Sequence, residues 1–240
     1  VIFFGVSDLS LYLKDINYVN CYLDSCHLEN PEFPEVKSLE TFFKREKNYK
    51  NILSSSVFIL SGSKECTNEL SINYNIKSDK VVEFPYLPQD EFSNEGKTEL
   101  NNFDNKYLQN FLAKPKKYIF YPANYWSHKN HIYIMKSLKK INLKQEIPFS
   151  LIFCGADKSG FVSNNKSYLI KKSKELEIKD NILFLSHVSN KDLINLYKNS
   201  FALVMPTYFG PINIPPIEAH KYGVPVIYSK QFANLHYDFD

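Results

Sequence analysis

The sequence predicts an α/β protein built from parallel, doubly wound sheets in two domains. Short apolar runs alternate with amphipathic helical patterns, the alternation occurs in both halves of the chain, and a polar segment separates the halves. Alternation at this spacing implies right-handed crossovers between parallel strands, and such sheets bind ligands at the carboxyl ends of their strands. The 240 residues, 44% of them hydrophobic, are enough for one large domain or two small ones.

The first half of the chain has the less regular pattern. Strands are predicted at residues 18–23, 57–61 and 81–84, and helices at 39–53 and 64–74. The chain begins inside an apolar run, at Val1, and stops at Asp240 without a terminal helix. We therefore expect a fragment in which both domains are truncated, with residues 1–100 forming the C-terminal part of the first domain.

The second half has the clearer pattern. Strands are predicted at 118–122, 149–154, 182–185, 201–205 and 224–228, and helices at 134–141, 167–176 and 214–222. Ser189 and Asp192 form a capping box before another helix, whose buried stripe contains Leu193, Leu196 and Tyr197. Residues 101–116, polar and with a helix near 107–112, are assigned to a linker, and residues 117–240 to the N-terminal part of the second domain.

Composition excludes several classes of protein. The net charge of +3 is too balanced for a protein that mainly grips a nucleic-acid backbone. The four cysteines form no CxxC pair, so neither a zinc site nor a disulfide framework is expected. No apolar run approaches the ~20 residues of a membrane-spanning helix, and no signal peptide opens the chain.

The segment 206–219 has the pattern of a phosphate-binding turn. Gly210 permits close approach of the backbone, and two prolines stand where the first turn of the next helix begins. The N–H groups at a helix start favour a phosphate, and Glu218, one turn further, can accept two hydrogen bonds from a ribose diol. The pattern also fits an ordinary helix with a favourable acid in its first turn.

The segment 121–131 also lies between a predicted strand and a predicted helix, so it should reach the same ligand edge. Lys129 is a compact cation suited to a diphosphate. His128 and His131 flank it, but their spacing does not match the i, i+4 spacing of helical zinc ligands, so no metal is predicted. Packing is the expected role of Trp126.

Several short motifs, in order, resemble glycosyltransferase family 4, whose members are retaining enzymes of the GT-B fold that use nucleotide sugars. The motifs are HKNH at 128–131, GPxNxPxxEA at 210–219 and GVPVI at 223–227, and 189–197 resembles the family's helix before the donor-site strand. In the first half, residues 24–33 resemble a D-x-x-H-x3-P-E-F element of one bacterial branch. Arg45 and Ser61 stand where similar members carry an arginine and a serine.

The resemblance implies a role for individual residues. By position, Lys129 would bind the donor diphosphate, Glu218 the nucleotide ribose, and His27 would lie near the reacting sugar or acceptor, although His27 also fits a core or capping histidine. The implied catalytic residues are His27 and Lys129, and the implied donor-binding residues are Asn124, Lys129, Gly210, Pro211, Ile212, Asn213 and Glu218. No cofactor is implied, because the nucleoside diphosphate sugar is a substrate.

The sequence departs from the family pattern at two positions. The family's Glu-x7-Glu pair lacks its first acid here, because Gly210 stands eight residues before Glu218. Asn124 stands where the family has an arginine, five residues before the diphosphate lysine. We read both as characters of the branch that carries GPxNxP, in which other groups hold the sugar hydroxyls and neutralise the leaving diphosphate.

The predicted function is transfer of a hexosyl group from a nucleoside diphosphate sugar to an acceptor hydroxyl, with retention, in bacterial surface polysaccharide or glycan biosynthesis. The alternatives are a non-catalytic GT-B protein that binds a nucleotide sugar or a partner, a GT-B sugar-nucleotide epimerase and a phosphorylase-like relative. The expected partners are the nucleotide sugar and a glycan or lipid-linked acceptor, not nucleic acid. The resemblance implies a cytoplasmic protein, with peripheral contact at the inner membrane face where the acceptor is lipid-linked.

Overall fold

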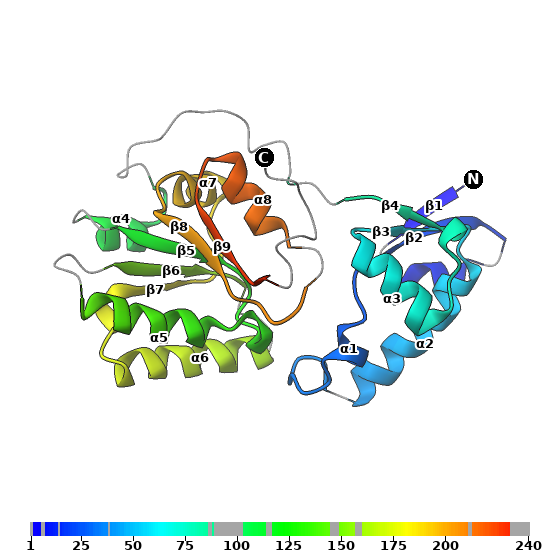
Figure 1. The fold of residues 1–240 in the computed structure, drawn as a ribbon, viewed down its shortest axis with the longest axis horizontal. Helices are drawn as coiled ribbons and strands as arrows, with labels where there is room; N and C mark the ends of the chain where they lie inside the picture. The colour runs from blue at the N-terminus through cyan, green and yellow to red at the C-terminus, as the bar shows by residue number, and fades with distance from the viewer. Residues whose placement is uncertain are drawn as a thin grey trace. The chain divides into compact units, whose positions relative to one another are not determined.

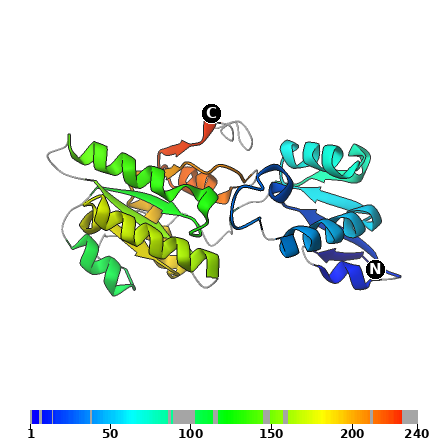
Figure 2. The same cartoon turned by 90° about the horizontal axis from the view of Figure 1, so that it is seen from below.

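The chain forms two compact units, each a parallel α/β sheet with helices packed against it (Figures 1 and 2). One unit is built mainly from residues 1–86 and the other mainly from residues 87–208 and 214–229. The computed structural model describes residues 2–5, 8–13, 15–37, 39–85, 88, 103–113, 117–144, 149–156, 160–210 and 213–230.

The first unit contains a four-stranded parallel sheet in the order β1-β2-β3-β4. Its strands are β1 (Ile2–Gly5), β2 (Asn17–Tyr22), β3 (Phe58–Ser61) and β4 (Val81–Glu83). Its helices are α1 (Cys26–Glu29), α2 (Leu39–Ser55) and α3 (Lys64–Tyr74), with short 3-10 helices η1 (Asp8–Tyr12) and η2 (Ser78–Lys80). The predicted strands and both predicted helices are confirmed, whereas β1 and α1 are elements that the sequence pattern did not predict.

Local sequence explains the ends of α3. Ser63 precedes the helix, and its side chain accepts a hydrogen bond from the backbone N–H of Cys66 at 3.2 Å. Asn75 ends the helix in the left-handed conformation, with φ of 53°, and donates its N–H to carbonyls of the last turn. At each end of α3, backbone groups that the helix itself leaves unpaired thus find a hydrogen-bond partner in a residue next to the helix.

The second unit contains a five-stranded parallel sheet in the order β7-β6-β5-β8-β9. Its strands are β5 (Tyr118–Pro122), β6 (Ser150–Cys154), β7 (Ile182–Leu185), β8 (Ala202–Met205) and β9 (Val226–Tyr228). Its helices are α4 (Lys106–Leu112), α5 (His131–Asn142), α6 (Gly160–Glu175), α7 (Asn190–Lys198) and α8 (Ile214–Lys221), with 3-10 helices η3 (Ser127–Lys129) and η4 (Lys179–Asn181). The predicted alternation of strands and helices is confirmed.

The strand order of this sheet reverses between β5 and β8. From β5 the chain continues outward through β6 and β7, then crosses back to place β8 on the other side of β5. The helices α5 and α6 cover one face of the sheet, and α7 and α8 cover the other (Figure 1). A reversal of this kind leaves the loops after β5 and β8 beside each other, where α/β sheets bind ligands.

The core of the second unit includes part of the predicted linker. Leu108 and Leu112 of α4 are 0% and 6% exposed and belong to the same hydrophobic cluster as Tyr118 and Leu196. Residues 103–113 therefore pack as part of the second unit, although their polar composition had assigned them to a connecting segment.

Asp192 attaches this segment to α7. Its carboxylate accepts the backbone N–H of Asp104 at 2.7 Å and that of Asn105 at 3.0 Å. The predicted capping box is thus formed only in part: Ser189 accepts the N–H of Asp192 at 3.1 Å, but the carboxylate of Asp192 is used by the residues that lead into α4.

Within the described ranges, no helix has both the length and the apolar character that a membrane crossing requires.

Candidate functional site

The two segments that the sequence selected as ligand loops are joined at the point where the strand order reverses. The backbone N–H of Tyr208, after β8, donates to the carbonyl oxygen of His128, after β5, at 2.8 Å. The buried hydroxyl of Thr207 donates to the same oxygen at 3.4 Å. The structure therefore brings together the segment of Lys129 and the segment that leads to Gly210.

Lys129 is half-buried at the end of η3, between β5 and α5. Its carbonyl oxygen accepts a hydrogen bond from the hydroxyl of Tyr121 at 2.9 Å, and Tyr121 is fully buried in β5. Asn130 follows in the left-handed conformation, with φ of 56°, and turns the chain into α5. These contacts fix the backbone from which the Lys129 side chain extends.

The two histidines beside Lys129 belong to the protein interior. His131 is 2% exposed, and its ring lies 4.9 Å from that of Tyr121, 5.3 Å from that of Tyr125 and 5.0 Å from that of Phe153. Burial lowers the pKa of His131 to about 3, so its imidazole is neutral at pH 7. His128 is also buried, and no group of three or more potential metal-ligating side chains occurs among the residues that the structure describes.

Asn124 connects the loops after β5 and β6. Its side-chain oxygen accepts the backbone N–H of Ala156 at 2.8 Å. Gly155 makes this approach possible, because a Cβ atom there would lie 2.1 Å from the carbonyl oxygen of Ala123. Asn124, predicted to bind the donor, is exposed and has a definite role in holding these loops together.

Gly210 and Asn213 form a turn before α8. The amide of Asn213 donates to the carbonyl oxygen of Gly210, whose φ of +122° is one that side-chain-bearing residues rarely adopt. Pro211 and Ile212, also predicted to bind the donor, lie outside the described residues.

The start of α8 offers fewer N–H donors than the sequence pattern suggested. The helix begins at Ile214, as predicted, so Pro215 and Pro216 occupy its second and third positions. Proline has no backbone N–H, so two of the four donors that a helix start normally presents are missing. A phosphate near this turn would therefore depend more strongly on a side-chain cation such as Lys129.

Glu218, in the second turn of α8, has a partner that the sequence pattern did not identify. Its Oε2 atom accepts a hydrogen bond from the hydroxyl of Tyr197, on α7. Burial raises the pKa of Glu218, and the hydrogen bond from Tyr197 opposes that shift. The sequence pattern places Tyr197 only in a buried stripe, but a buried tyrosine hydroxyl normally has a polar partner, and that is the signal from which this contact could have been expected.

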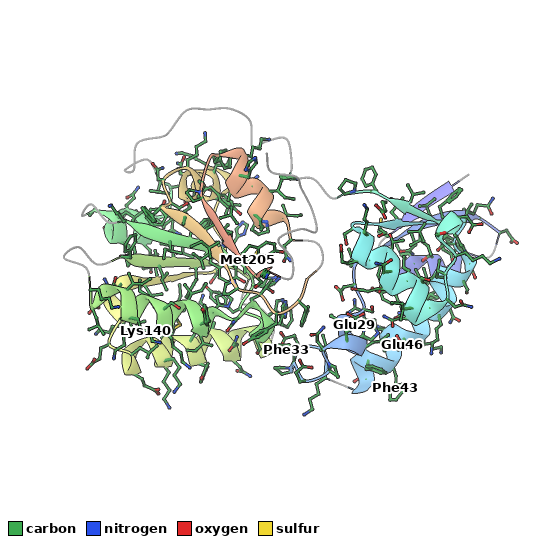
Figure 3. The ribbon with its side chains drawn as sticks, viewed as in Figure 1. Glu29, Phe33, Phe43, Glu46, Lys140 and Met205 are labelled. Carbon is green, nitrogen blue, oxygen red and sulfur yellow. The ribbon has the colours of Figure 1, made fainter. Side chains whose placement is uncertain are left out.

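His27 lies in the first unit, in α1, the short helix that follows β2. It is 1% exposed, and its Nε2 atom lies 2.8 Å from Oε1 of Glu46. Glu46 is labelled on α2 in Figure 3. Tyr74 donates its hydroxyl to the same oxygen at 2.7 Å. Burial lowers the pKa of His27 although Glu46 opposes this, so the ring is neutral at pH 7.

Arg45, the only arginine of the sequence, organises the loop that precedes His27. Its Nη2 atom donates to Oδ1 of Asp24 at 2.7 Å, to the carbonyl oxygen of Asp24 at 2.8 Å and to the hydroxyl of Tyr49 at 3.1 Å. Burial alone would raise the pKa of the Asp24 carboxyl, but Arg45 together with hydrogen bonds from Cys26 holds that pKa below its usual value. The aspartate and histidine of the D-x-x-H element thus each pair with a residue of α2.

Arg45→Met is expected to lower the free energy of unfolding by about 2 kcal/mol at pH 7, because it leaves the Asp24 carboxylate without its charged partner. The pKa of Asp24 is lower in the folded than in the unfolded state. The pair therefore adds to the free energy of unfolding at pH values above the unfolded pKa of about 4, and this contribution is lost as the pH falls through the folded pKa. The difference between the two proteins should therefore shrink below pH ~4.

Urea denaturation at pH 7 and pH 3 measures this difference. Arg45→Lys is the control for charge alone, and it should recover less than half of the loss because an ammonium cannot reproduce the planar fork. Equal stability of Arg45→Met and the unmodified protein at pH 7 would show that the Asp24 pair contributes nothing.

Comparison with known proteins identifies a family. Residues 103–237 match the model of the family described as Glycosyl transferases group 1, which is more than half of the chain. O-antigen chain mannosyltransferase RfbU of Salmonella typhimurium is 29% identical over 175 residues. The match covers 72% of this chain and 45% of RfbU, so the chain spans just under half the length of that relative.

Solved structures share the fold. Anabaena HepE, in complex with UDP-glucose, superposes with a TM-score of 0.74 at 11% identity, over 95% of this chain and 59% of HepE. Sucrose-phosphate synthase from Thermosynechococcus elongatus gives 0.73 at 16% identity, over 95% of this chain and 56% of that enzyme. WaaG, a glycosyltransferase involved in lipopolysaccharide biosynthesis, gives 0.66 at 14% identity, over 96% of this chain and 60% of WaaG. The chain belongs to the group 1 glycosyl transferases and has the GT-B fold.

Proposed function

We propose that this chain is part of a glycosyltransferase that moves a hexosyl group from a nucleoside diphosphate sugar to an acceptor hydroxyl, with retention of the anomeric configuration. The observation that carries the proposal is the pair of hydrogen bonds from Tyr208 and Thr207 to His128. They hold the Lys129 loop against the loop that leads into the helix of Glu218, at the edge where such sheets bind ligands.

The donor would be held by groups from both loops. Lys129 would contact the diphosphate, the turn from Gly210 to Asn213 would enclose the phosphate and sugar, and Glu218 would accept hydrogen bonds from the two ribose hydroxyls. An ionised carboxylate is suited to a diol because both of its oxygens accept hydrogen bonds and the group has no donor of its own. Asn124 would contribute to donor binding by holding together the loops after β5 and β6.

The chemical demand of the transfer is stabilisation of negative charge on the leaving diphosphate. A cation aimed at the group where charge develops stabilises the transition state more than the bound donor. Lys129 is the residue that we assign to this task, without a metal ion. His27 would act on the side of the acceptor or reacting sugar, with its ring oriented by Glu46.

The relatives indicate the kind of product. RfbU is named as an O-antigen chain mannosyltransferase, and WaaG is described as involved in lipopolysaccharide biosynthesis. HepE was solved with UDP-glucose. These names support a nucleotide-sugar donor and a role in bacterial surface glycan synthesis.

One observation favours a second candidate, a protein that binds a nucleotide sugar without transferring the sugar. Gly210 stands where the family's first acid would be, so a group expected to hold the sugar is absent from that position. Release of labelled sugar to an acceptor extract separates the two candidates, because only the enzyme consumes the donor.

The test of the donor site is nucleotide affinity in the full-length protein, measured by calorimetry with UDP, GDP and ADP. Glu218→Gln is expected to weaken binding of the preferred nucleotide by about tenfold, because hydrogen bonds to a charged group contribute about 1.5–3 kcal/mol. Glu175→Gln, which alters an acid on α6 that pairs with Lys172, is the control and should leave the affinity unchanged. Equal affinities for all three proteins would remove the ribose role of Glu218.

A further inference from the structure

The contact between Tyr197 and Glu218 joins two helices beneath the proposed donor site. Tyr197 lies on α7 and is 0% exposed, whereas Glu218 lies on α8 and is only partly buried. The hydroxyl of Tyr197 donates to Oε2 of Glu218. The other carboxylate oxygen, Oε1, is not the acceptor of this hydrogen bond.

The tyrosine ring is held firmly in place. It packs edge-on against Phe120 of the central strand β5, with 5.0 Å between ring centroids. The carbonyl oxygen of Tyr197 accepts both the N–H and the hydroxyl of Ser200, at 3.0 and 2.8 Å. The hydroxyl is therefore a fixed donor that can select one orientation of the Glu218 carboxylate.

We propose that Tyr197 is a positioning residue for the donor site, which orients the Glu218 carboxylate and keeps it able to accept the two hydroxyls of a ribose diol. This inference rests on the proposed function, because it assigns Tyr197 to the same nucleotide-binding carboxylate. Tyr197 would not itself touch the donor, since its side chain is buried and its hydroxyl is used by Glu218.

The titratable surroundings of the pair make the effect measurable. Burial raises the pKa of Glu218, and the Tyr197 hydroxyl lowers it by stabilising the ionised form. Among the described residues, the phenol of Tyr222 and the thiol of Cys154 on β6 interact electrostatically with the pair, Lys198 lies over the ring of Tyr222, and His220 and Lys221 follow Glu218 on α8. Burial raises the pKa of Tyr222 to about 12 and that of Cys154 to about 12, so neither group titrates on the acid side of neutral pH.

Loss of the hydroxyl should raise the pKa of Glu218 further. A carboxyl that is protonated carries its own O–H and accepts a diol less well, so nucleotide binding should fall as the pH drops through the pKa of Glu218. In Tyr197→Phe this fall should occur at a pH higher by about one unit, the equivalent of one hydrogen bond to a charged group. A variant that merely loosened the fold would lose affinity equally at every pH.

The experiment measures the affinity for UDP, GDP and ADP from pH 5 to pH 8.5 in the full-length protein and in Tyr197→Phe. The affinity of each protein is expressed as a ratio to that of Glu218→Gln at the same pH, which cancels the titration of the nucleotide phosphates and leaves the fall that belongs to the Glu218 carboxyl. Tyr118→Phe is the matched control, because its equally buried hydroxyl donates to the carbonyl oxygen of Leu196, the neighbour of Tyr197, at 2.9 Å. Glu218→Gln should abolish the acid-side fall and so assign it to this carboxyl.

Each outcome has one meaning. A midpoint raised by about one pH unit in Tyr197→Phe, but not in Tyr118→Phe, supports the positioning role. Nucleotide binding with the same midpoint in all three proteins, or an equal shift in both tyrosine variants, overturns it and leaves the proposed function standing. Absence of binding of every nucleotide by the folded, unmodified protein overturns the proposed function itself.

Discussion

Lys129→Ala is expected to lower kcat for sugar transfer by about 10²–10³-fold while weakening donor binding by less than tenfold. The difference arises because charge on the leaving diphosphate grows in the transition state, so a fixed cation stabilises that state more than the bound donor. The start of α8 cannot replace the lost charge, because Pro215 and Pro216 provide no N–H groups there. Steady-state kinetics with a labelled donor and, separately, the equilibrium affinity for the donor measure the two effects.

Lys140→Ala is the control for the Lys129 experiment. Lys140 is an exposed lysine on α5, in the same unit (Figure 3), and its removal changes the net charge equally. It should leave both kcat and affinity unchanged. Two results would show that Lys129 has no special role in the departure of the diphosphate. In the first, Lys129→Ala lowers donor affinity and kcat by the same factor. In the second, Lys129→Ala leaves both quantities unchanged, as Lys140→Ala should.

Much of the fold could be predicted because its signals are local. The strands at Tyr118–Pro122 and Ile182–Leu185 are apolar runs flanked by helical patterns, and both were predicted with the bounds that the structure has. The α4 segment was not assigned to the core, because its few apolar residues, among them Phe103, Leu108 and Leu112, stand in a stretch rich in Asn, Asp and Lys. Only their packing against the second sheet shows which unit they belong to.

The candidate site was predictable in its loops but not in its supporting contacts. A strand followed by a glycine or lysine and then a helix is visible in the sequence, so the segments of Lys129 and Gly210 could be selected in advance. The partners of Glu218 and His27 are Tyr197 and Glu46, which are 21 and 19 residues away along the chain. Such pairs depend on how helices pack, which periodicity does not describe. The catalytic and donor-binding roles themselves stay predictions.

Gly155→Ala is expected to be the most destabilising conservative change in the second unit, with a loss of about 3 kcal/mol in the free energy of unfolding. Its Cβ would lie 2.1 Å from the carbonyl oxygen of Ala123 and 2.7 Å from Cα of Asn124. Both are backbone atoms, so the loop after β5 must move away, and the hydrogen bond from Ala156 N–H to Asn124 would break. Because that loop continues to Lys129, donor affinity should fall in the same variant.

Gly223→Ala separates the steric effect at Gly155 from the general cost of replacing a glycine. Gly223 has a φ of +66° and nothing within 4 Å of an added Cβ, so its replacement should cost only about 1 kcal/mol of backbone strain. Urea denaturation and donor affinity of the two variants give the comparison. A loss for Gly155→Ala no larger than that for Gly223→Ala would mean that the loops after β5 and β6 do not approach as closely as described. A larger loss that is accompanied by weaker donor binding would show that the contact between these loops holds the Lys129 segment in its binding position.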